Sequence, residues 1–163
     1  MTVQLEHRVK EPPGPMEAEH RYRAVAWWTA GQAGLTKSEA APNALHFAAP
    51  PEFGGLEGRW TPESLLLSAV ASCFTTTFDA LARNSRFEYV DLEVVAEGSI
   101  HKSEKGYSFA DIVIRPKLTV PNEEERQRGL VLLNKTKAIC MVSRALAAPP
   151  VCEPCIQVAG APH

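Results

Sequence analysis

Two cysteines in apolar, helix-like stretches are the residues of this chain most capable of chemistry. Cys73 lies in SLLLSAVASCFTTTF, and Cys140 lies in TKAICMVSRALA. No local motif links them, so only the fold can bring them together. If they meet, they can form a peroxide-reducing dithiol; if they do not, each is a small buried thiol of the core.

A cysteine nucleophile needs a lowered pKa, which a nearby cation or hydrogen-bond donor supplies. Glu63 stands ten residues before Cys73. It is either a carboxylate that favours a helix start or one that orients an arginine beside the thiolate. Arg59, in a glycine-rich loop, and Arg144, one turn after Cys140, are the candidate arginines, and an ordinary surface position is the alternative for each.

Aromatic residues near this glycine-rich loop suggest a substrate pocket. Trp60, Phe53 and Phe74 are predicted to form its apolar lining, and His46 stands where it could reach the same loop. The alternative is that the aromatic side chains belong to the core and that the histidine is structural.

A second pair of cysteines, Cys152 and Cys155, forms a C-x-x-C motif in a strand-like segment near the C-terminus. No helix follows it, unlike the motif of a thioredoxin-like protein, and a zinc site would need two further ligands. The five histidines show no paired spacing. A redox or metal role and an incidental pair both stay open.

Composition narrows the class of protein. The 163 residues suit one compact domain, and the net charge of −2 without a basic run argues against a nucleic-acid partner. The longest apolar stretch, around 65–74, is too short to span a bilayer, and the polar N-terminus lacks the apolar core of a signal peptide. We therefore expect a cytoplasmic protein with free thiols and no membrane partner.

The periodicity of apolar residues predicts the elements that must position these side chains. Residues 1–19 are predicted to be a flexible arm, and 20–163 a single domain. The predicted strands cover residues 20–30, 34–40, 44–49, 89–102, 107–120 and 151–159. The predicted helices cover residues 61–85, 122–133 and 135–147, the last two divided near Asn134. Strands joined by hairpins, with helices between them, indicate an α+β fold, and no nucleotide-binding motif calls for a bound cofactor.

Two segments resemble the motifs of a known family. TPESLLLSAVASCF resembles the N/T-P-E-x-L-x-x-A-x-x-A-C-F signature of the OsmC/Ohr family of osmotically inducible and organic hydroperoxide resistance proteins. CMVSRAL resembles that family's second motif, C-P-x-S-x-A, and the likeness covers about residues 20–158. It implies antiparallel sheets wrapped around central buried helices, in an intertwined homodimer with active sites at the subunit interface.

The resemblance also implies roles for single residues. Cys73 would be the peroxidatic thiolate, Cys140 the resolving cysteine, and Glu63 the carboxylate that holds a catalytic arginine. The substrate would be an organic hydroperoxide or hydrogen peroxide. No cofactor would be bound, and an external dithiol, in the family typically the lipoyl group of a protein, would restore both thiols.

The chain departs from the family pattern at two positions. The Ohr branch carries its arginine in a G-G-R turn, where this chain has A-G-Q with Gln32, and Met141 replaces the usual proline after the second cysteine. We therefore expect a divergent OsmC-like protein in which Arg59 or another arginine activates Cys73, or in which peroxidase activity is weak. The alternative is a non-catalytic protein of the same fold that binds a small apolar or thiol ligand.

Overall fold

The computed structural model describes residues 20–29 and 31–160, which divide between Arg59 and Trp60 into two compact units. The predicted flexible arm, 1–19, lies outside the described residues. The prediction of a single domain over 20–163 stays a prediction.

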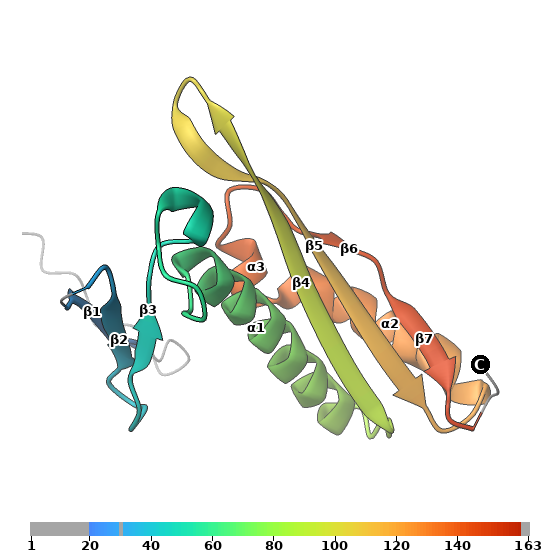
Figure 1. Ribbon diagram of the computed structural model, residues 1–163. Coiled ribbons are helices and arrows are strands. Elements are labelled where there is room, and N and C mark those ends of the chain that lie inside the picture. The colour runs from blue at the N-terminus through green and yellow to red at the C-terminus, as the bar shows by residue number, and fades with distance from the viewer. Residues whose placement is uncertain (1–19, 30, 161–163) are drawn as a thin grey trace, which may run out of the picture. The chain divides into compact units, whose positions relative to one another are not determined.

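The first unit is a three-stranded antiparallel sheet with the order β1-β2-β3 (Figure 1). Its strands β1 (Ala24–Trp28), β2 (Gly34–Ser38) and β3 (Leu45–Phe47) confirm the three that the sequence predicts here, and the short 3-10 helix η1 (Pro51–Phe53) follows them. Gly34 has to be a glycine, because a Cβ there would lie 2.4 Å from the Phe47 ring. All five residues of β1 are exposed.

The second unit combines three helices with a four-stranded sheet (Figure 1). Its elements are α1 (Pro62–Asn84), β4 (Asp91–Ser103), β5 (Gly106–Val120), α2 (Glu124–Ile139), α3 (Met141–Arg144), β6 (Val151–Cys152) and β7 (Cys155–Val158). The predicted β4–β5 hairpin is confirmed, and Gly106 takes a φ of 102° at its turn, where glycine is favoured. The predicted last strand is divided into β6 and β7, and both pair with β5 in parallel, so this sheet is mixed rather than wholly antiparallel.

The start of α1 follows directly from its sequence. Pro62 occupies the first turn, and the Thr61 hydroxyl accepts a hydrogen bond from the Ser64 backbone N–H at 3.1 Å. Ser64 returns the bond, because its hydroxyl accepts from the Thr61 N–H at 2.8 Å. The predicted helix start is confirmed, with Ser64 completing the capping box.

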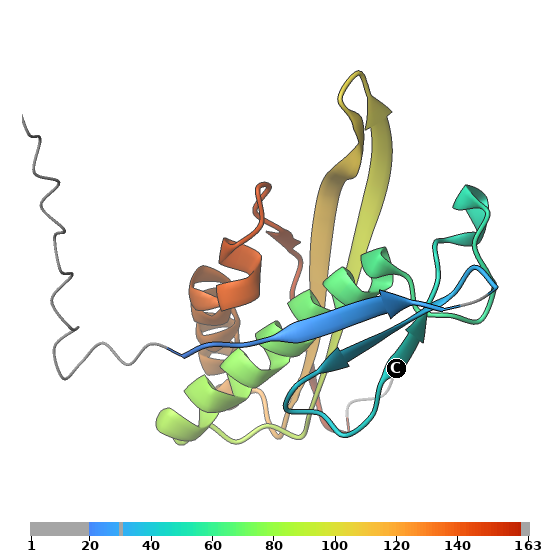
Figure 2. The ribbon, with the colours of Figure 1, turned by 90° about the vertical axis from the view of Figure 1, so that its left-hand side faces the viewer.

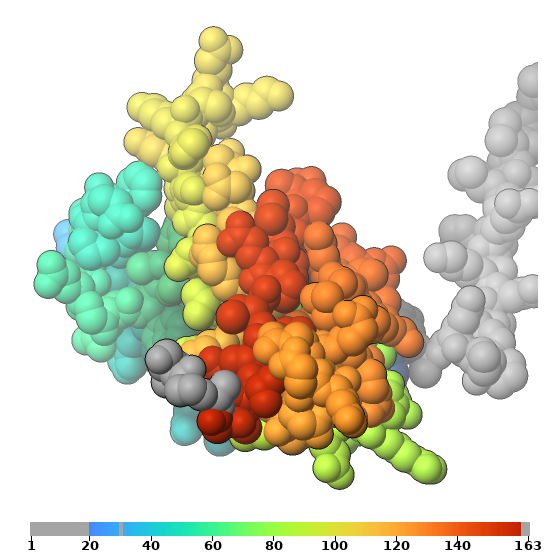
Figure 3. All heavy atoms as spheres, turned by 90° about the vertical axis from the view of Figure 1, so that its right-hand side faces the viewer, coloured from blue at the N-terminus to red at the C-terminus, as the bar shows by residue number. Residues whose placement is uncertain are grey.

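Helices α1 and α2 cover one face of the sheet (Figure 2). The buried side chains of α1 recur every four residues, at Val70, Phe74, Phe78 and Ala82. Alternate residues of β5 face them and are buried as well, as period-two alternation requires: Ile112, Ile114, Pro116, Leu118 and Val120. In the space-filling view, α2 and the C-terminal strands form one continuous surface (Figure 3).

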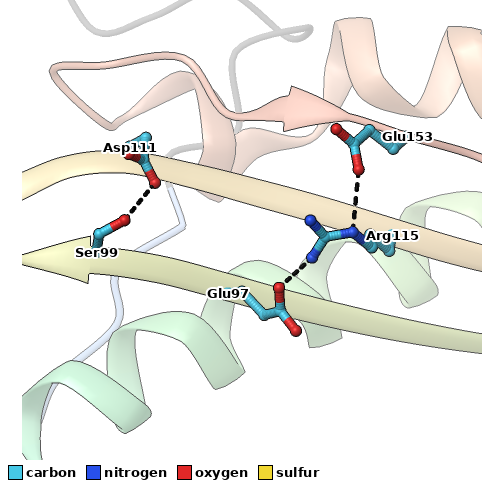
Figure 4. A network of polar contacts seen from close by, with 5 residues as sticks. All are labelled: Glu97, Ser99, Asp111, Arg115 and Glu153. Carbon is cyan, nitrogen blue, oxygen red and sulfur yellow. Dashed lines mark hydrogen bonds and ion pairs between the residues drawn. The ribbon is translucent and has the colours of Figure 1, made fainter.

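The opposite face of the sheet is polar. Arg115 of β5 lies between Glu97 of β4 and Glu153, which follows β6, and forms an ion pair with each (Figure 4). Ser99 donates a hydrogen bond to Asp111 at 2.7 Å on the same hairpin. These groups are solvent-exposed, so they contribute little to stability but keep this face of the hairpin hydrated.

The predicted division of the last two helices near Asn134 is wrong. Asn134 is exposed and stays helical, and α2 continues to Ile139. The break falls at Cys140, whose φ of −57° and ψ of 111° are those of an extended residue. The following helix, α3, has only four residues and ends at Arg144 instead of continuing to 147.

Helix α1 is long and apolar enough to cross a membrane by length and composition. The expectation from the sequence rested on the apolar stretch at 65–74 alone, which is too short to span a bilayer. The length and composition of α1 are weak support for a membrane location, because the core helix of a soluble protein passes the same test and the Phe74 face of α1 packs into the second unit's core.

Candidate active site

The second unit brings Cys73 and Cys140 together. Cys73 lies on α1 beside the buried Phe74 face, and Cys140 occupies the junction between α2 and α3. The Val142 N–H, two residues after Cys140, donates a hydrogen bond to the Cys73 sulfur at 3.5 Å, and each of the two thiols shifts the pKa of the other. Cys140 is fully buried and Cys73 is half-buried, so an external molecule reaches the pair from the Cys73 side.

Hydrogen-bonding groups lie around the Cys73 sulfur. The Val142 N–H donates to it at 3.5 Å, and the Thr77 hydroxyl lies 4.0 Å away on the same helix. Burial opposes ionisation of Cys73, but these hydrogen bonds and the neighbouring Cys140 thiol outweigh it. The pKa of Cys73 therefore lies below its ordinary value of 9.0.

The pKa of Cys140 is shifted in the opposite direction. Burial raises its pKa, and the adjoining Cys73 raises it further, while the Ser143 hydroxyl, which donates to the Cys140 sulfur at 3.2 Å, lowers it in part. The net direction is upward from 9.0. Cys73 therefore ionises at a lower pH than Cys140.

Glu63 lies in the first turn of α1. Ten residues of helix separate it from Cys73, which is about 15 Å along the axis, so the carboxylate reaches the sulfur only through a third group. Its Oε2 atom is shielded from solvent and has no hydrogen-bond partner among the residues that the structure describes. A shielded carboxylate oxygen without a donor is costly, which fits a site that needs a cation.

Arg144 is not bonded to the groups that it was expected to join. Among the described residues, no hydrogen bond joins Arg144 to the Cys73 sulfur, and no ion pair joins it to Glu63. Arg144 instead lines a cavity of about 270 Å³ with Ser143 and Lys137. Arg59 is the last residue of the first unit, and its predicted pairing with Glu63 stays a prediction.

Gln32 occupies an exposed turn of the first unit with a φ of 64°, in the left-handed region.

The predicted pocket residues are divided between the two units. His46 of β3 and Phe53 of η1 are exposed in the first unit, and Trp60 is exposed in the second. Phe74 is fully buried in the second unit's core, where it packs as a core aromatic side chain. A pocket formed by the exposed three stays a prediction.

The C-x-x-C pair is held apart by the sheet. Cys152 is in register with Ile114 and Cys155 with Lys117, so the segment stays extended and the two Cα atoms are about 10 Å apart. A disulfide requires roughly 4.4–6.8 Å. Cys152 packs against the core and Cys155 is exposed, and among residues 20–29 and 31–160 no cluster of potential metal ligands forms.

The sequence alone does not reveal the donors to Cys73. The backbone amide of Val142 carries no sequence signal, because every residue except proline has an N–H. Thr77 was recoverable in principle, because it stands one helical turn after Cys73, and so was Ser143, the serine of the second motif, as a donor to Cys140.

The second unit is thus an α+β protein whose central helix presents a half-buried, readily ionised thiol to a buried partner thiol. Residues 55–154 match the family model described as OsmC-like protein. The chain belongs to the OsmC-like protein family.

Individual relatives are distant. The uncharacterized protein YmaD of Bacillus subtilis (strain 168) is 24% identical over 132 residues, which cover 79% of this chain and 88% of YmaD. Peroxiredoxin OsmC of Escherichia coli (strain K12) is 27% identical over 96 residues, covering 59% and 66%. The structure of an organic hydroperoxide resistance protein OsmC from Legionella pneumophila superposes with a TM-score of 0.69 at 24% identity, covering 87% of this chain and all of that one.

Proposed function

We propose that this chain is a cysteine-based hydroperoxide reductase in which Cys73 attacks the peroxide and Cys140 resolves the product. The observation that carries the proposal is the contact between two thiols whose pKa values are shifted in opposite directions. A peroxidatic cysteine must be a thiolate, whereas a resolving cysteine can wait as a thiol. The peroxiredoxin name of the Escherichia coli relative supports the same reaction.

The reaction takes place in two steps on the protein. The Cys73 thiolate attacks one oxygen of the O–O bond, forms a sulfenic acid and releases an alkoxide, which leaves as the alcohol after taking up a proton. The Cys140 sulfur then attacks the sulfenic sulfur. This step forms the Cys73–Cys140 disulfide, and the Cys140 proton and the sulfenic hydroxyl leave as water.

An external dithiol, such as a lipoyl group carried by a protein, completes the cycle. Its thiolate attacks the more accessible sulfur, Cys73, and releases Cys140 as a thiol. The second sulfur of the reductant displaces Cys73 and becomes oxidised to a cyclic disulfide. The burial of Cys140 supports this direction of attack.

We further propose that the working form is a homodimer in the cytoplasm and that an arginine pairs with Glu63 in it. The shielded, unpartnered Oε2 atom of Glu63 supports the need for that cation. Arg59 stays the candidate within this chain. The exposed aromatic side chains Trp60 and Phe53, with His46, are proposed to favour an organic peroxide over hydrogen peroxide.

The test is the consumption of cumene hydroperoxide with dihydrolipoamide as reductant. We expect wild-type turnover, its loss in Cys73→Ser, and unchanged turnover in Cys155→Ser, because Cys155 is exposed on β7 away from the pair. Cys140→Ser should permit one oxidation of Cys73 but no disulfide. Absence of turnover in the wild type, or turnover that survives Cys73→Ser, would overturn the proposal.

The second candidate function is a non-catalytic protein that binds a small apolar or thiol ligand. The observation that favours it is Gln32, a neutral side chain in the turn where the family resemblance places an arginine. A neutral amide does not supply a fixed positive charge beside a thiolate. This candidate predicts a measurable affinity for dihydrolipoamide without peroxide consumption, which the same assay separates from catalysis.

A further inference from the structure

The second unit contains a cavity of about 270 Å³ that is lined by β5, the end of α2, α3 and the segment that leads to β6 (Figure 1). Its lining combines apolar side chains with polar ones. The apolar residues are Ile114, Leu146, Pro149 and Pro150, and the polar ones are Lys137, Ser143 and Arg144. None of these lining residues is acidic, so the cavity is an apolar space with two cations at its wall.

The two cations have no counter-ion in the described part of the chain. No ion pair joins the side chain of Lys137 or Arg144 to another residue that the structure describes. Lys137 lies in the last turn of α2 and Arg144 in the last turn of α3, and a helix end favours a positive charge. The dipole accounts for each position singly. Two unpaired cations that line one cavity also give it a positive potential, which attracts an anion.

We propose that this cavity binds a small carboxylate that carries a compact apolar body. The carboxylate accepts charge-assisted hydrogen bonds from Lys137 and Arg144, and the apolar body lies against Ile114 and Leu146. A dry cavity of about 150 Å³ holds a benzene molecule, so the larger volume here has room for a ring and its carboxylate. An inorganic anion would leave the apolar part of the lining without a partner, which is why an amphipathic carboxylate fits better.

The cavity adjoins the candidate active site through one residue. Ser143 lines the cavity, and its hydroxyl donates to the Cys140 sulfur at 3.2 Å. Neither Cys73 nor Cys140 is among the described residues that line the cavity. The carboxylate site is therefore a neighbour of the second thiol and is separate from the sulfur that is proposed to attack the peroxide.

The experiment titrates the full chain with benzoate and follows the backbone amide resonances of Ser143, Arg144 and Leu146 by NMR. Benzamide, which has the ring without the charge, and acetate, which has the charge without the ring, are titrated in parallel. The ionic strength is held constant, because salt screens exposed charges. We expect saturable shifts with benzoate and about tenfold weaker binding of each of the other two, since each lacks one of the two interactions.

Lys137→Gln and Arg144→Gln test the two cations separately. Each should weaken benzoate binding about tenfold, because one charge-assisted hydrogen bond is lost. Lys135→Gln is the matched control. It removes the same charge from an exposed position of α2, and Lys135 is not among the described residues that line the cavity, so this variant should keep the wild-type affinity.

Equal affinities for benzoate and benzamide would contradict the proposal, as would equal losses of affinity in Lys135→Gln and Lys137→Gln. Benzoate shifts that leave the amides of Ser143, Arg144 and Leu146 unmoved would contradict it too. The comparison of the three ligands needs only the wild type, so it decides the question even if a variant does not fold. No peroxide is present in these titrations, so their outcome is independent of the proposed reaction.

Discussion

Ser143 adjusts the reactivity of the second thiol through one hydrogen bond. Its hydroxyl donates to the Cys140 sulfur at 3.2 Å and partly offsets the effect of burial on the Cys140 pKa. In Ser143→Ala we expect that pKa to rise further above 9.0, because the donor that favours the thiolate is lost. Disulfide formation should slow about threefold to tenfold, since the attacking sulfur ionises less readily.

The measurement for Ser143→Ala is dimedone trapping of the Cys73 sulfenic acid after one equivalent of peroxide. A longer-lived sulfenic acid than in the wild type is the expected result, with an unchanged rate of its formation. The difference should diminish as the pH rises, because Cys140 then ionises even without the hydroxyl. Equal lifetimes in the two proteins would show that Ser143 is only a packing residue.

Glu63 is the second residue whose role can be separated from stability. We expect Glu63→Gln to lower peroxide consumption about tenfold or more, because an amide no longer holds an arginine by charge. The melting temperature should stay the same or rise, since the shielded Oε2 atom has no donor among the described residues and an amide is cheaper to bury than a carboxylate.

The matched control is Glu124→Gln, an exposed carboxylate in the first turn of α2. Both glutamates favour a helix start through the dipole, so a loss of activity confined to Glu63→Gln separates a role at the site from a role in the helix. Equal effects of both substitutions, or none of either, would leave Glu63 as a helix-start residue.

At the scale of elements, the close approach of α2 to the sheet depends on a glycine. A Cβ at Gly129 would lie 2.8 Å from Leu118 Cδ2 and 3.4 Å from Phe87 Cζ. Alanine would normally stabilise a helix interior by about 1 kcal/mol over glycine, but overpacking a buried contact costs roughly 1–3 kcal/mol. We expect Gly129→Ala to lower the free energy of unfolding by about 1–2 kcal/mol.

Urea unfolding measures this difference, with Asn134→Ala as the control on the exposed side of α2. That control should be neutral or slightly stabilising, because alanine has the higher helix propensity and nothing is buried there. If Gly129→Ala were as stable as the control, α2 would be free to move away from Leu118, and the packing of these two elements would be looser than the structure shows.

The elements also show how far the sequence predicts the fold. Helix α1 was predictable because its cap, its proline and its four-residue apolar repeat all agree, and the β4–β5 hairpin because alternation and Gly106 agree. The break at Cys140 was not, because no glycine or proline marks it and Asn134 offers a more typical interruption. The break is imposed by tertiary packing against α1.

The sequence likewise predicts some features of the candidate site and not others. The family resemblance implied that Cys73 and Cys140 form a pair, but it also implied that the activating group is an arginine. The groups found at the Cys73 sulfur are the Thr77 hydroxyl and the Val142 amide, and the position of the amide follows from a backbone turn that residue types do not encode. Glu63 was predicted to orient an arginine, and the structure shows that its Oε2 atom is shielded and has no hydrogen-bond partner among the described residues.

At the scale of the whole molecule, the first strand of the first unit exposes several large apolar side chains. In the single chain Trp28 is 62% exposed, Val25 45% and Trp27 42%, and because neighbouring strand residues point to opposite faces, both faces of β1 are involved. Large exposed apolar patches mark protein–protein contacts, and short sheets need a packed face for stability. This is the physical reason to expect a second copy over β1.

We therefore expect light scattering after size exclusion to give about twice the chain mass of 17.8 kDa. Trp28→Lys should shift the protein toward the monomer, because a charge would have to be buried in the interface. Tyr22→Lys is the control, since Tyr22 precedes β1 and is 89% exposed. A monomeric wild type, or a dimer indifferent to Trp28→Lys, would mean that the apolar surface of β1 is not what joins two copies. Because the proposed cation for Glu63 is assigned to the dimer, Trp28→Lys should also lower peroxide consumption while leaving the Val142 amide at Cys73, which belongs to the same chain as Cys73, in place.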